Sequence, residues 1–202
     1  MEILKYEKKG NGNYLIYFSL GKRLEINEEV ILKHKLLYKK EIDDELLDKI
    51  IKDNNDYDIY NKCVSYIGIR LRSVFEIKEY MKRKGVSQEL SSKVVEKLIS
   101  NKLLDDRVYT RAFINDKLKF TTMGPNRIRM ELERQKIDRD IINEYIYDID
   151  EDLINEKNNK QIDKIIKSNK NKKNLKNKIY TNLTNLGYTY DMIMNNLNNY
   201  DL

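Results

Sequence analysis

The sequence predicts a mainly α-helical protein of tandem three-helix repeats, with a small α+β extension at its N-terminus. The first observation is a repeat, because Val86, Ile137 and Tyr188 are 51 residues apart and each precedes a Ser, Asp or Thr that can cap a helix. Apolar residues keep the same spacing: Cys63, Ile114 and Ile165; Ile77, Ile128 and Ile179; Met81, Leu132 and Leu183; Leu90, Ile141 and Met192. This period indicates stacked helical units, each too small to bury its apolar face alone.

Composition is the second observation. The 202 residues include one proline and seven glycines, with 40% apolar and 36% charged residues. So few turn-forming residues favour helices over a turn-rich β protein. The net charge of +6 favours a polyanionic partner and says nothing about the fold.

The third observation concerns the first 55 residues, which differ from the repeats. Residues 3–6, 14–18 and 23–26 are apolar or alternating, and they predict an antiparallel sheet of two or three strands. Asn27 is expected to cap a helix that reaches about Leu37. Asp43 or Asp44 is expected to cap a second helix over 45–52. The polar residues 54–56 predict a break, so we expect the N-terminal extension to span residues 1–55.

Repeat 1 is expected at residues 56–105, with helices at 57–69, 74–84 and 88–101. Ser73 and Glu76 form the pattern of a capping box, and Gly85 suits a left-handed residue at a helix end. Repeat 2 is expected at 106–149, with helices at 106–120, 126–136 and 139–148, and Pro125 opens its middle helix. Repeat 3 is expected at 150–202, where Gly187 marks another helix end.

Enzyme chemistry has little support in the sequence. His34 and Cys63 are expected to be structural, and Asp105 and Asp106 are expected to cap a helix. We therefore predict no catalytic residue, metal site or cofactor, and no transmembrane helix or signal peptide. A single cysteine fits the reducing cytoplasm.

Basic residues are the candidate contact residues, because arginine forks onto phosphate and is concentrated between positions 70 and 139. The candidate set is Arg70, Arg72, Lys82, Arg83, Arg107, Arg111, Arg127 and Arg129. The alternative is that these basic residues only form a solvated face. Residues 82–84 in addition lie in the last turn of their helix, where positive charge interacts favourably with the helix dipole. Tyr80 and Tyr109 could stack on bases, whereas Tyr66 and Tyr188 are expected in the core.

Several segments resemble the signatures of the RecX family, regulators of the RecA recombinase. These segments are Tyr66 to Arg70 with Arg72, Ser73 and Glu76; Lys82 to Gly85; Leu103 to Asp106 with Arg111, Ala112 and Phe113; Gly124, Pro125, Arg127, Ile128 and Leu132; and Gly187 with Tyr188. The N-terminal extension resembles that of members from Gram-positive bacteria. Two departures are Asn185 and Leu186, where the family often has basic residues, and the loop 121–123, where relatives are usually basic or glycine-rich.

The resemblance implies three repeats in an elongated, curved array that lies in the groove of a RecA filament on single-stranded DNA. It implies a non-enzymatic, monomeric, cytoplasmic regulator that modulates the filament, with inhibition as the expected direction, and that binds single-stranded DNA weakly and in a salt-dependent way. A different class of function stays open. A helix-turn-helix transcriptional regulator would need a base-reading helix and usually a dimer.

Overall fold

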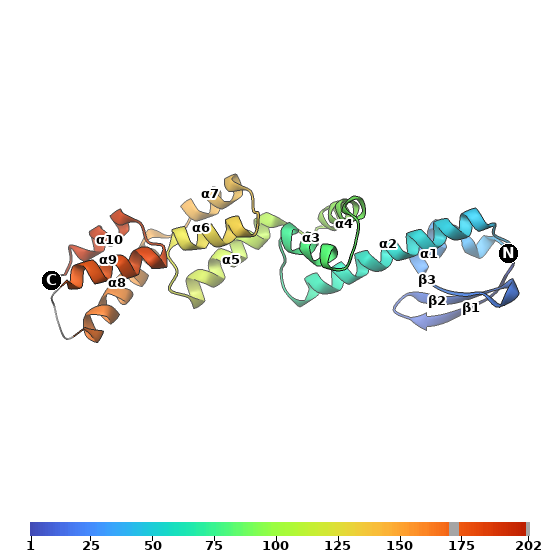
Figure 1. Cartoon of the computed structure of the whole chain (residues 1–202), viewed down its shortest axis with the longest axis horizontal. Helices are drawn as coiled ribbons and strands as arrows, with labels where there is room; N and C mark the ends of the chain where they lie inside the picture. Colours follow the sequence, from blue (N-terminus) through green and yellow to red (C-terminus); the bar gives the residue numbers. More distant parts are fainter. Residues whose placement is uncertain (170–173, 201–202) are drawn as a thin grey trace. The chain divides into compact units, whose positions relative to one another are not determined.

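The computed structural model describes residues 1–169 and 174–200, and it divides into two compact units. Unit 1 contains residues 1–70 and 78–103, and unit 2 contains 71–77 and 104–202. Residues 170–173 and 201–202 of the expected third repeat lie outside the described residues. In chain order (Figure 1), the elements are β1 (Ile3–Gly10), β2 (Asn13–Phe18), β3 (Arg23–Asn27), α1 (Glu28–Lys33), α2 (Asp44–Ile69), α3 (Val74–Arg83), α4 (Gln88–Ser100), α5 (Asp106–Phe120), α6 (Pro125–Arg134), α7 (Arg139–Tyr147), α8 (Glu151–Ser168), α9 (Leu175–Leu186) and α10 (Tyr190–Leu197).

The three N-terminal strands form an antiparallel sheet in the order β1-β2-β3, as the sequence predicts. Because side chains alternate across a strand, Ile16 and Phe18 of β2 point to the same face, and both are buried with Ile26 of β3. Buried residues of α1 and α2 complete this core of unit 1: Val30, Ile31, Leu47 and Ile50. The side chain of Asn27 accepts the N–H of Glu29 (3.0 Å) and caps α1 as expected.

The predicted helical break at residues 54–56 is wrong, because α2 runs without interruption from Asp44 to Ile69. The polar residue Asn54 tethers this helix to the sheet. Its Oδ1 accepts the N–H of Asn27 (2.8 Å), and its Nδ2 donates to the carbonyl of Glu25 (3.1 Å). The helix predicted to reach Leu37 is also shorter, since α1 ends at Lys33. The boundary proposed at residue 55 therefore falls inside a helix, and the division of the chain into three repeats stays a prediction.

The 51-residue spacing is visible in the backbone. The second helix of each repeat ends with the same hydrogen bond, in which an N–H donates to the carbonyl five residues earlier. The pairs are Val86 to Met81 (3.1 Å), Ile137 to Leu132 (3.3 Å) and Tyr188 to Leu183 (3.1 Å). The residue before each donor has a positive φ: Gly85 (73°), Lys136 (56°) and Gly187 (93°). This is the Schellman ending, in which a left-handed residue lets the chain turn out of the helix.

Helix caps and buried residues follow the same register. The capping box of α3 is present, because the N–H of Glu76 donates to Ser73 Oγ (3.1 Å) and the N–H of Ser73 donates to Glu76 Oε2 (3.2 Å). The third helix of each repeat is capped by the residue that the sequence predicts. The caps are Ser87 for α4, Asp138 for α7 and Thr189 for α10. The residues at 77, 128 and 179 and at 81, 132 and 183 are all fully buried.

Unit 2 has two apolar clusters, one around α5 to α7 and one around α8 to α10, and Leu118 and Ile149 pack against both. Lys157 of α8 also joins them, because its Nζ donates to the carbonyl of Thr121 (2.6 Å) and to that of Leu118 at the end of α5. A cation at a helix C-terminus interacts favourably with the helix dipole. The two helical sets of unit 2 are therefore fastened by packing and by a charged side chain.

Replacing Lys136 with glycine is expected to stabilise unit 2. Lys136 holds a left-handed φ of 56°, which costs an L-residue about 1 kcal/mol that glycine avoids. We expect a rise in Tm of about 3 °C, measured by circular dichroism. Lys136→Ala removes the same charge without relieving the backbone and should give no gain. An equal rise with alanine would contradict this explanation.

Candidate nucleic-acid interface

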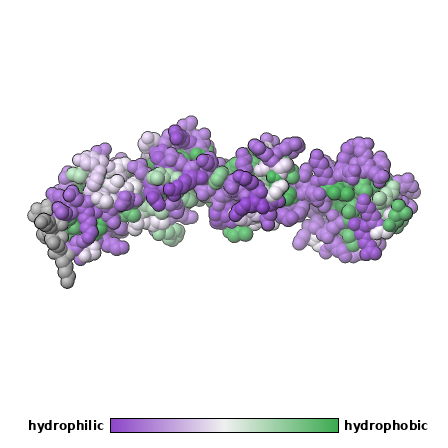
Figure 2. Space-filling view, viewed as in Figure 1, coloured by the Kyte–Doolittle hydropathy of each residue, from purple (hydrophilic) through white to green (hydrophobic). Residues whose placement is uncertain are grey.

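The eight predicted basic residues divide between the two units. Unit 1 holds Arg70, Lys82 and Arg83. Unit 2 holds the other five, which are Arg72, Arg107, Arg111, Arg127 and Arg129. Figure 2 shows that hydrophilic residues cover most of the visible surface, so exposure and pairing must decide which of these charges can meet a partner.

Arg72 does not fit the contact role that the sequence predicts. Its side chain is only 9% exposed, and its Nη1 lies 3.5 Å from Glu76 Oε1. Glu76 is the acidic member of the capping box at the start of α3. A guanidinium that supports a helix cap is held inside the fold, so we assign Arg72 a structural role.

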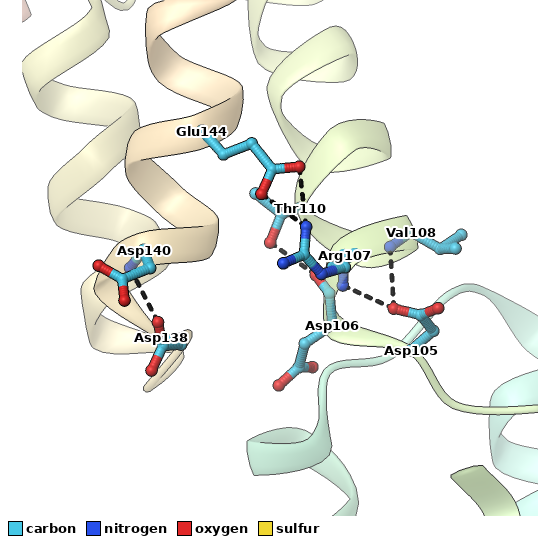
Figure 3. Close-up of polar contacts among 8 residues, drawn as sticks. All are labelled: Asp105, Asp106, Arg107, Val108, Thr110, Asp138, Asp140 and Glu144. Atoms are coloured by element: carbon cyan, nitrogen blue, oxygen red, sulfur yellow. Dashed lines mark hydrogen bonds and ion pairs between the residues drawn. The ribbon is translucent and has the colours of Figure 1, made fainter. Parts of the chain in front are cut away.

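Arg107 is exposed but already paired. Its Nη1 donates to both carboxylate oxygens of Glu144 (2.8 and 2.6 Å), which joins α5 to α7 (Figure 3). This hydrogen bond raises the pKa of Arg107 above its ordinary value. Both side chains are about half exposed (52% each), so a phosphate can reach Arg107. The phosphate would have to compete with Glu144 for the guanidinium.

The acidic residues around Arg107 cap helices, as the sequence predicts for Asp105 and Asp106. Asp105 Oδ1 accepts the N–H groups of Arg107 (2.8 Å) and Val108 (3.3 Å) at the start of α5 (Figure 3). Asp106 Oδ1 instead accepts the N–H of Val74 (2.8 Å), so it caps the start of α3 across the repeat boundary. These carboxylates therefore stabilise helix starts.

The remaining arginines of unit 2 differ in availability. Arg111 is exposed on α5, one turn after Arg107. Arg127 and Arg129 are half-buried on α6, and Nη1 of Arg129 donates to Oδ1 of Asn143 on α7. Arg111 is therefore the more available cation, while Arg127 and Arg129 present only part of their side chains.

Unit 1 offers a built cationic groove between α3 and α4. Its volume is about 460 Å³. Lys78 and Lys82 lie one turn apart on α3, and Gln88, Ser91 and Ser92 face them from the first turns of α4. Lysine, serine and glutamine side chains, and the N-termini of helices, are among the groups that contact phosphate in nucleic-acid complexes. Glu79 is the one acidic side chain among the lining residues.

Lys82 and Arg83 are predicted from sequence, but Lys78 is missed. Lys82 is 79% exposed and only 4.0 Å from Glu79, while the Nε of Arg83 donates to the backbone carbonyl of Glu79 (3.3 Å). The repeat register would have revealed Lys78, because it occupies the same position as Arg129 and Tyr180. We call the surface between the second and third helices of a repeat the seam; it includes these three residues.

The potential catalytic groups have structural surroundings. Cys63 is fully buried, and burial raises the pKa of its thiol to about 11, which disfavours a reactive thiolate. His34 Nε2 lies 2.7 Å from Asp53 Oδ2, which is also paired with Lys33. Over residues 1–169 and 174–200, no three His, Cys, Asp or Glu side chains gather as a metal site. The same part of the chain has no helix long and apolar enough to cross a membrane.

The tyrosines that could stack on bases are largely engaged in the described structure. Tyr66 and Tyr80 stack on each other with ring centroids 4.4 Å apart, and Tyr109 is buried against Phe113. Tyr188 is buried as predicted, and burial raises its pKa to about 12. Base stacking by Tyr80 or Tyr109 would therefore require these pairs to open.

Comparisons with known proteins agree with the three-helix architecture. A family profile described as the first three-helix domain of RecX matches residues 60–98, and the second three-helix domain matches residues 105–146. A crystal structure of a regulatory protein RecX has a TM-score of 0.85 at 22% identity, and it covers 96% of this chain and 98% of that one. The crystal structure of RecX from Lactobacillus salivarius has a TM-score of 0.68 at 23% identity, and the match covers 73% of this chain and 97% of that one.

Curated relatives carry the same description. A regulatory protein RecX of Lactobacillus johnsonii is 30% identical over 145 residues, which are 72% of this chain and 54% of the relative. The regulatory protein RecX of Enterococcus faecalis is 28% identical over 154 residues, which are 75% of this chain and 58% of the relative. The regulatory protein RecX of Listeria monocytogenes is 26% identical over 191 residues, which are 94% of this chain and 71% of the relative. The chain thus spans little more than half the length of the first two relatives.

Proposed function

Because the chain belongs to the RecX family, a family of regulatory proteins, we propose that it binds the filament that a RecA-type recombinase forms on single-stranded DNA. In this proposal it inhibits filament growth and thereby regulates recombination and DNA repair in the cytoplasm. It acts as a monomer without enzymatic activity or a cofactor, and it touches single-stranded DNA weakly.

The observation that carries the proposal is the repeated seam in a chain of tandem helical units. The same backbone ending recurs at 86, 137 and 188, and basic residues occupy the seam of the first two repeats at Lys78 and Arg129. A binding element that recurs every 51 residues along the chain suits a partner that itself repeats, and a protein filament on DNA is such a partner. Cations at these positions can meet phosphates or acidic protein surface.

The proposed contact residues are those that the structure leaves accessible. They include Lys82, Arg83 and Arg111, together with Lys78. Arg107 and Arg129 contribute through side chains already paired with Glu144 and Asn143. Arg70 is exposed at the end of α2 but engaged in an interaction, and Arg127 is half-buried. Arg72 is removed from the proposed surface because its side chain is buried beside Glu76.

A titration of recombinase activity tests the proposal. The ATPase and strand-exchange activities of a RecA-type recombinase on single-stranded DNA would be measured with increasing amounts of this protein. Strong inhibition at far less than one copy per recombinase subunit is expected, because one protein in the filament can stop the addition of many subunits. Inhibition that begins only when the protein saturates the DNA would indicate competition for DNA and refute the proposal.

The helix-turn-helix regulator is not supported by the third helix of repeat 1. Helix α4 contains no arginine or asparagine and a single glutamine, Gln88, and its exposed Glu89 and Lys93 pair with each other (2.6 Å). It therefore offers few of the groups that read base edges. Footprinting on duplex DNA provides the check. Protected sites at a fixed spacing would favour the regulator.

A further inference from the structure

Repeat 3 carries an exposed pair of aromatic side chains in its seam. Tyr180 of α9 and Tyr190 of α10 have ring centroids 6.1 Å apart and ring planes at 70°. Their residues are 38% and 61% exposed. An edge-to-face pair leaves ring faces free to stack on a further flat group.

The repeat register shows which residues occupy the positions of this pair in repeats 1 and 2. Tyr180 occupies the position of Lys78 in repeat 1 and Arg129 in repeat 2, and Tyr190 occupies that of Gln88 and Arg139. In repeats 1 and 2 these positions carry cationic or polar side chains, which suit phosphates. In repeat 3 the same positions carry aromatic rings, which suit the flat faces of bases.

The stretch of sequence that leads to the pair is basic. No acidic residue occurs in the sequence between Asp163 and Asp191, and the lysines described in this stretch are Lys164, Lys167, Lys176 and Lys178. Lys176 is exposed one turn before Tyr180 on α9, so it lies on the same side of the helix. A cation beside an open aromatic ring complements the phosphate and the base of one nucleotide.

The helix that presents Tyr180 is itself mostly at the surface. Only Leu175, Ile179 and Leu183 are buried along α9, which is a narrow stripe with a four-residue spacing. The helix also has no acidic residue. Its exposed side chains are therefore lysine, asparagine, threonine and tyrosine, a composition that can track a nucleic-acid strand without repelling it.

We propose that Tyr180 and Tyr190 form a stacking site for an unpaired base of single-stranded DNA, with Lys176 contacting a neighbouring phosphate. Duplex DNA is excluded from this site because its bases are stacked on one another and present only their edges. The inference deepens the proposed function, since it rests on the single-stranded DNA contact included there, but it does not depend on the recombinase.

Equilibrium binding to two matched strands tests the stacking site. Fluorescence anisotropy would compare labelled oligo(dT) with an abasic deoxyribose-phosphate strand of equal length. The intact protein should bind oligo(dT) more tightly. The double variant Y180A/Y190A should lose about tenfold in affinity for oligo(dT), the value of one base stack, with little change for the abasic strand. Y180F/Y190F should retain the affinity, because phenylalanine keeps the ring.

Controls separate stacking from other effects. Tyr38→Ala removes a tyrosine that is 89% exposed in unit 1 and should change neither affinity. An unchanged affinity of Y180A/Y190A for oligo(dT), or an equal loss on both strands, would overturn the inference. If the intact protein fails to inhibit the recombinase but shows the tyrosine-dependent preference for oligo(dT), the proposed function fails while the stacking site stands.

Discussion

Replacing Gly187 with alanine is expected to destabilise unit 2 by about 3 kcal/mol. Gly187 has a φ of 93°, which costs an L-residue about 1 kcal/mol. An added Cβ would also lie 2.4 Å from the backbone nitrogen of Arg127. Because that atom belongs to the first turn of α6, it cannot move as the end of a side chain can. Overpacking of this kind costs about 1–3 kcal/mol.

The contact at Gly187 also carries hydrogen bonds between the two helical sets of unit 2. The N–H of Gly124 donates to the carbonyl of Leu186 (2.7 Å), and the N–H of Asn126 donates to the carbonyl of Gly187 (3.0 Å). The end of α9 thus satisfies N–H groups at the start of α6, which have no partner within their own helix. Pushing these backbones apart would weaken both hydrogen bonds together with the apolar contact.

Thermal unfolding followed by circular dichroism measures the effect, with a loss in Tm of roughly 10 °C expected. Gly85→Ala is the matched control, because Gly85 ends α3 in repeat 1 with a φ of 73° and no atom lies within 4 Å of its added Cβ. The control should cost only about 1 kcal/mol, the conformational part. Equal losses in the two variants would show that the backbone contact at Gly187 contributes nothing.

The repeated parts of the fold could be predicted because their determinants are local. A few neighbouring side chains determine each recurring feature: the buried apolar position, the residue that caps a helix start, and the left-handed residue that ends a helix. The structure confirms them at Ser73, Ser87 and Thr189 and in the buried stripes of α3, α6 and α9. Lys136 shows that the conformation is set by position in the repeat even where the residue is not glycine.

The incorrect break at residues 54–56 shows where local reasoning failed. Asn54 and its polar neighbours have low helix propensity, so they are typical of a loop. In the fold, Asn54 hydrogen-bonds Asn27 and the carbonyl of Glu25 across the edge of the sheet. Its partners are more than 20 residues away in sequence, and contacts of this range are not encoded in a local pattern.

The candidate site was predicted only in part for a related reason. Counting charges selects Arg72 and Lys82 equally, but the first is 9% exposed and the second 79% exposed. Burial depends on how α3 packs, which composition does not reveal. Lys78 was missed because it stands apart from the arginines and from the basic run at 82–84, and Tyr180 was missed because it carries no charge, although the 51-residue register places both in the seam.

Reversing the charge of Lys78 and Lys82 together is expected to have the largest effect on polyanion binding in unit 1. The two side chains line the groove of about 460 Å³ between α3 and α4, opposite Ser91 and Ser92. K78E/K82E would replace two cations with two anions beside Glu79, and phosphates would be repelled. We expect affinity for single-stranded DNA to fall at least about tenfold at low salt. Recombinase inhibition should weaken in the same variant.

Salt dependence and a matched variant identify the cause. If each lysine neutralises one phosphate, its loss lowers the slope of log K against log salt by about 0.7, so K78Q/K82Q should lower it by about 1.4. K39E/K40E makes the same change in net charge at two exposed positions of unit 1 that do not line the groove. If K39E/K40E weakens binding as much as K78E/K82E, net charge alone governs binding and the groove has no special role. A selective effect of the groove variant, with unchanged thermal unfolding, would mean that the seam of repeat 1 holds phosphate.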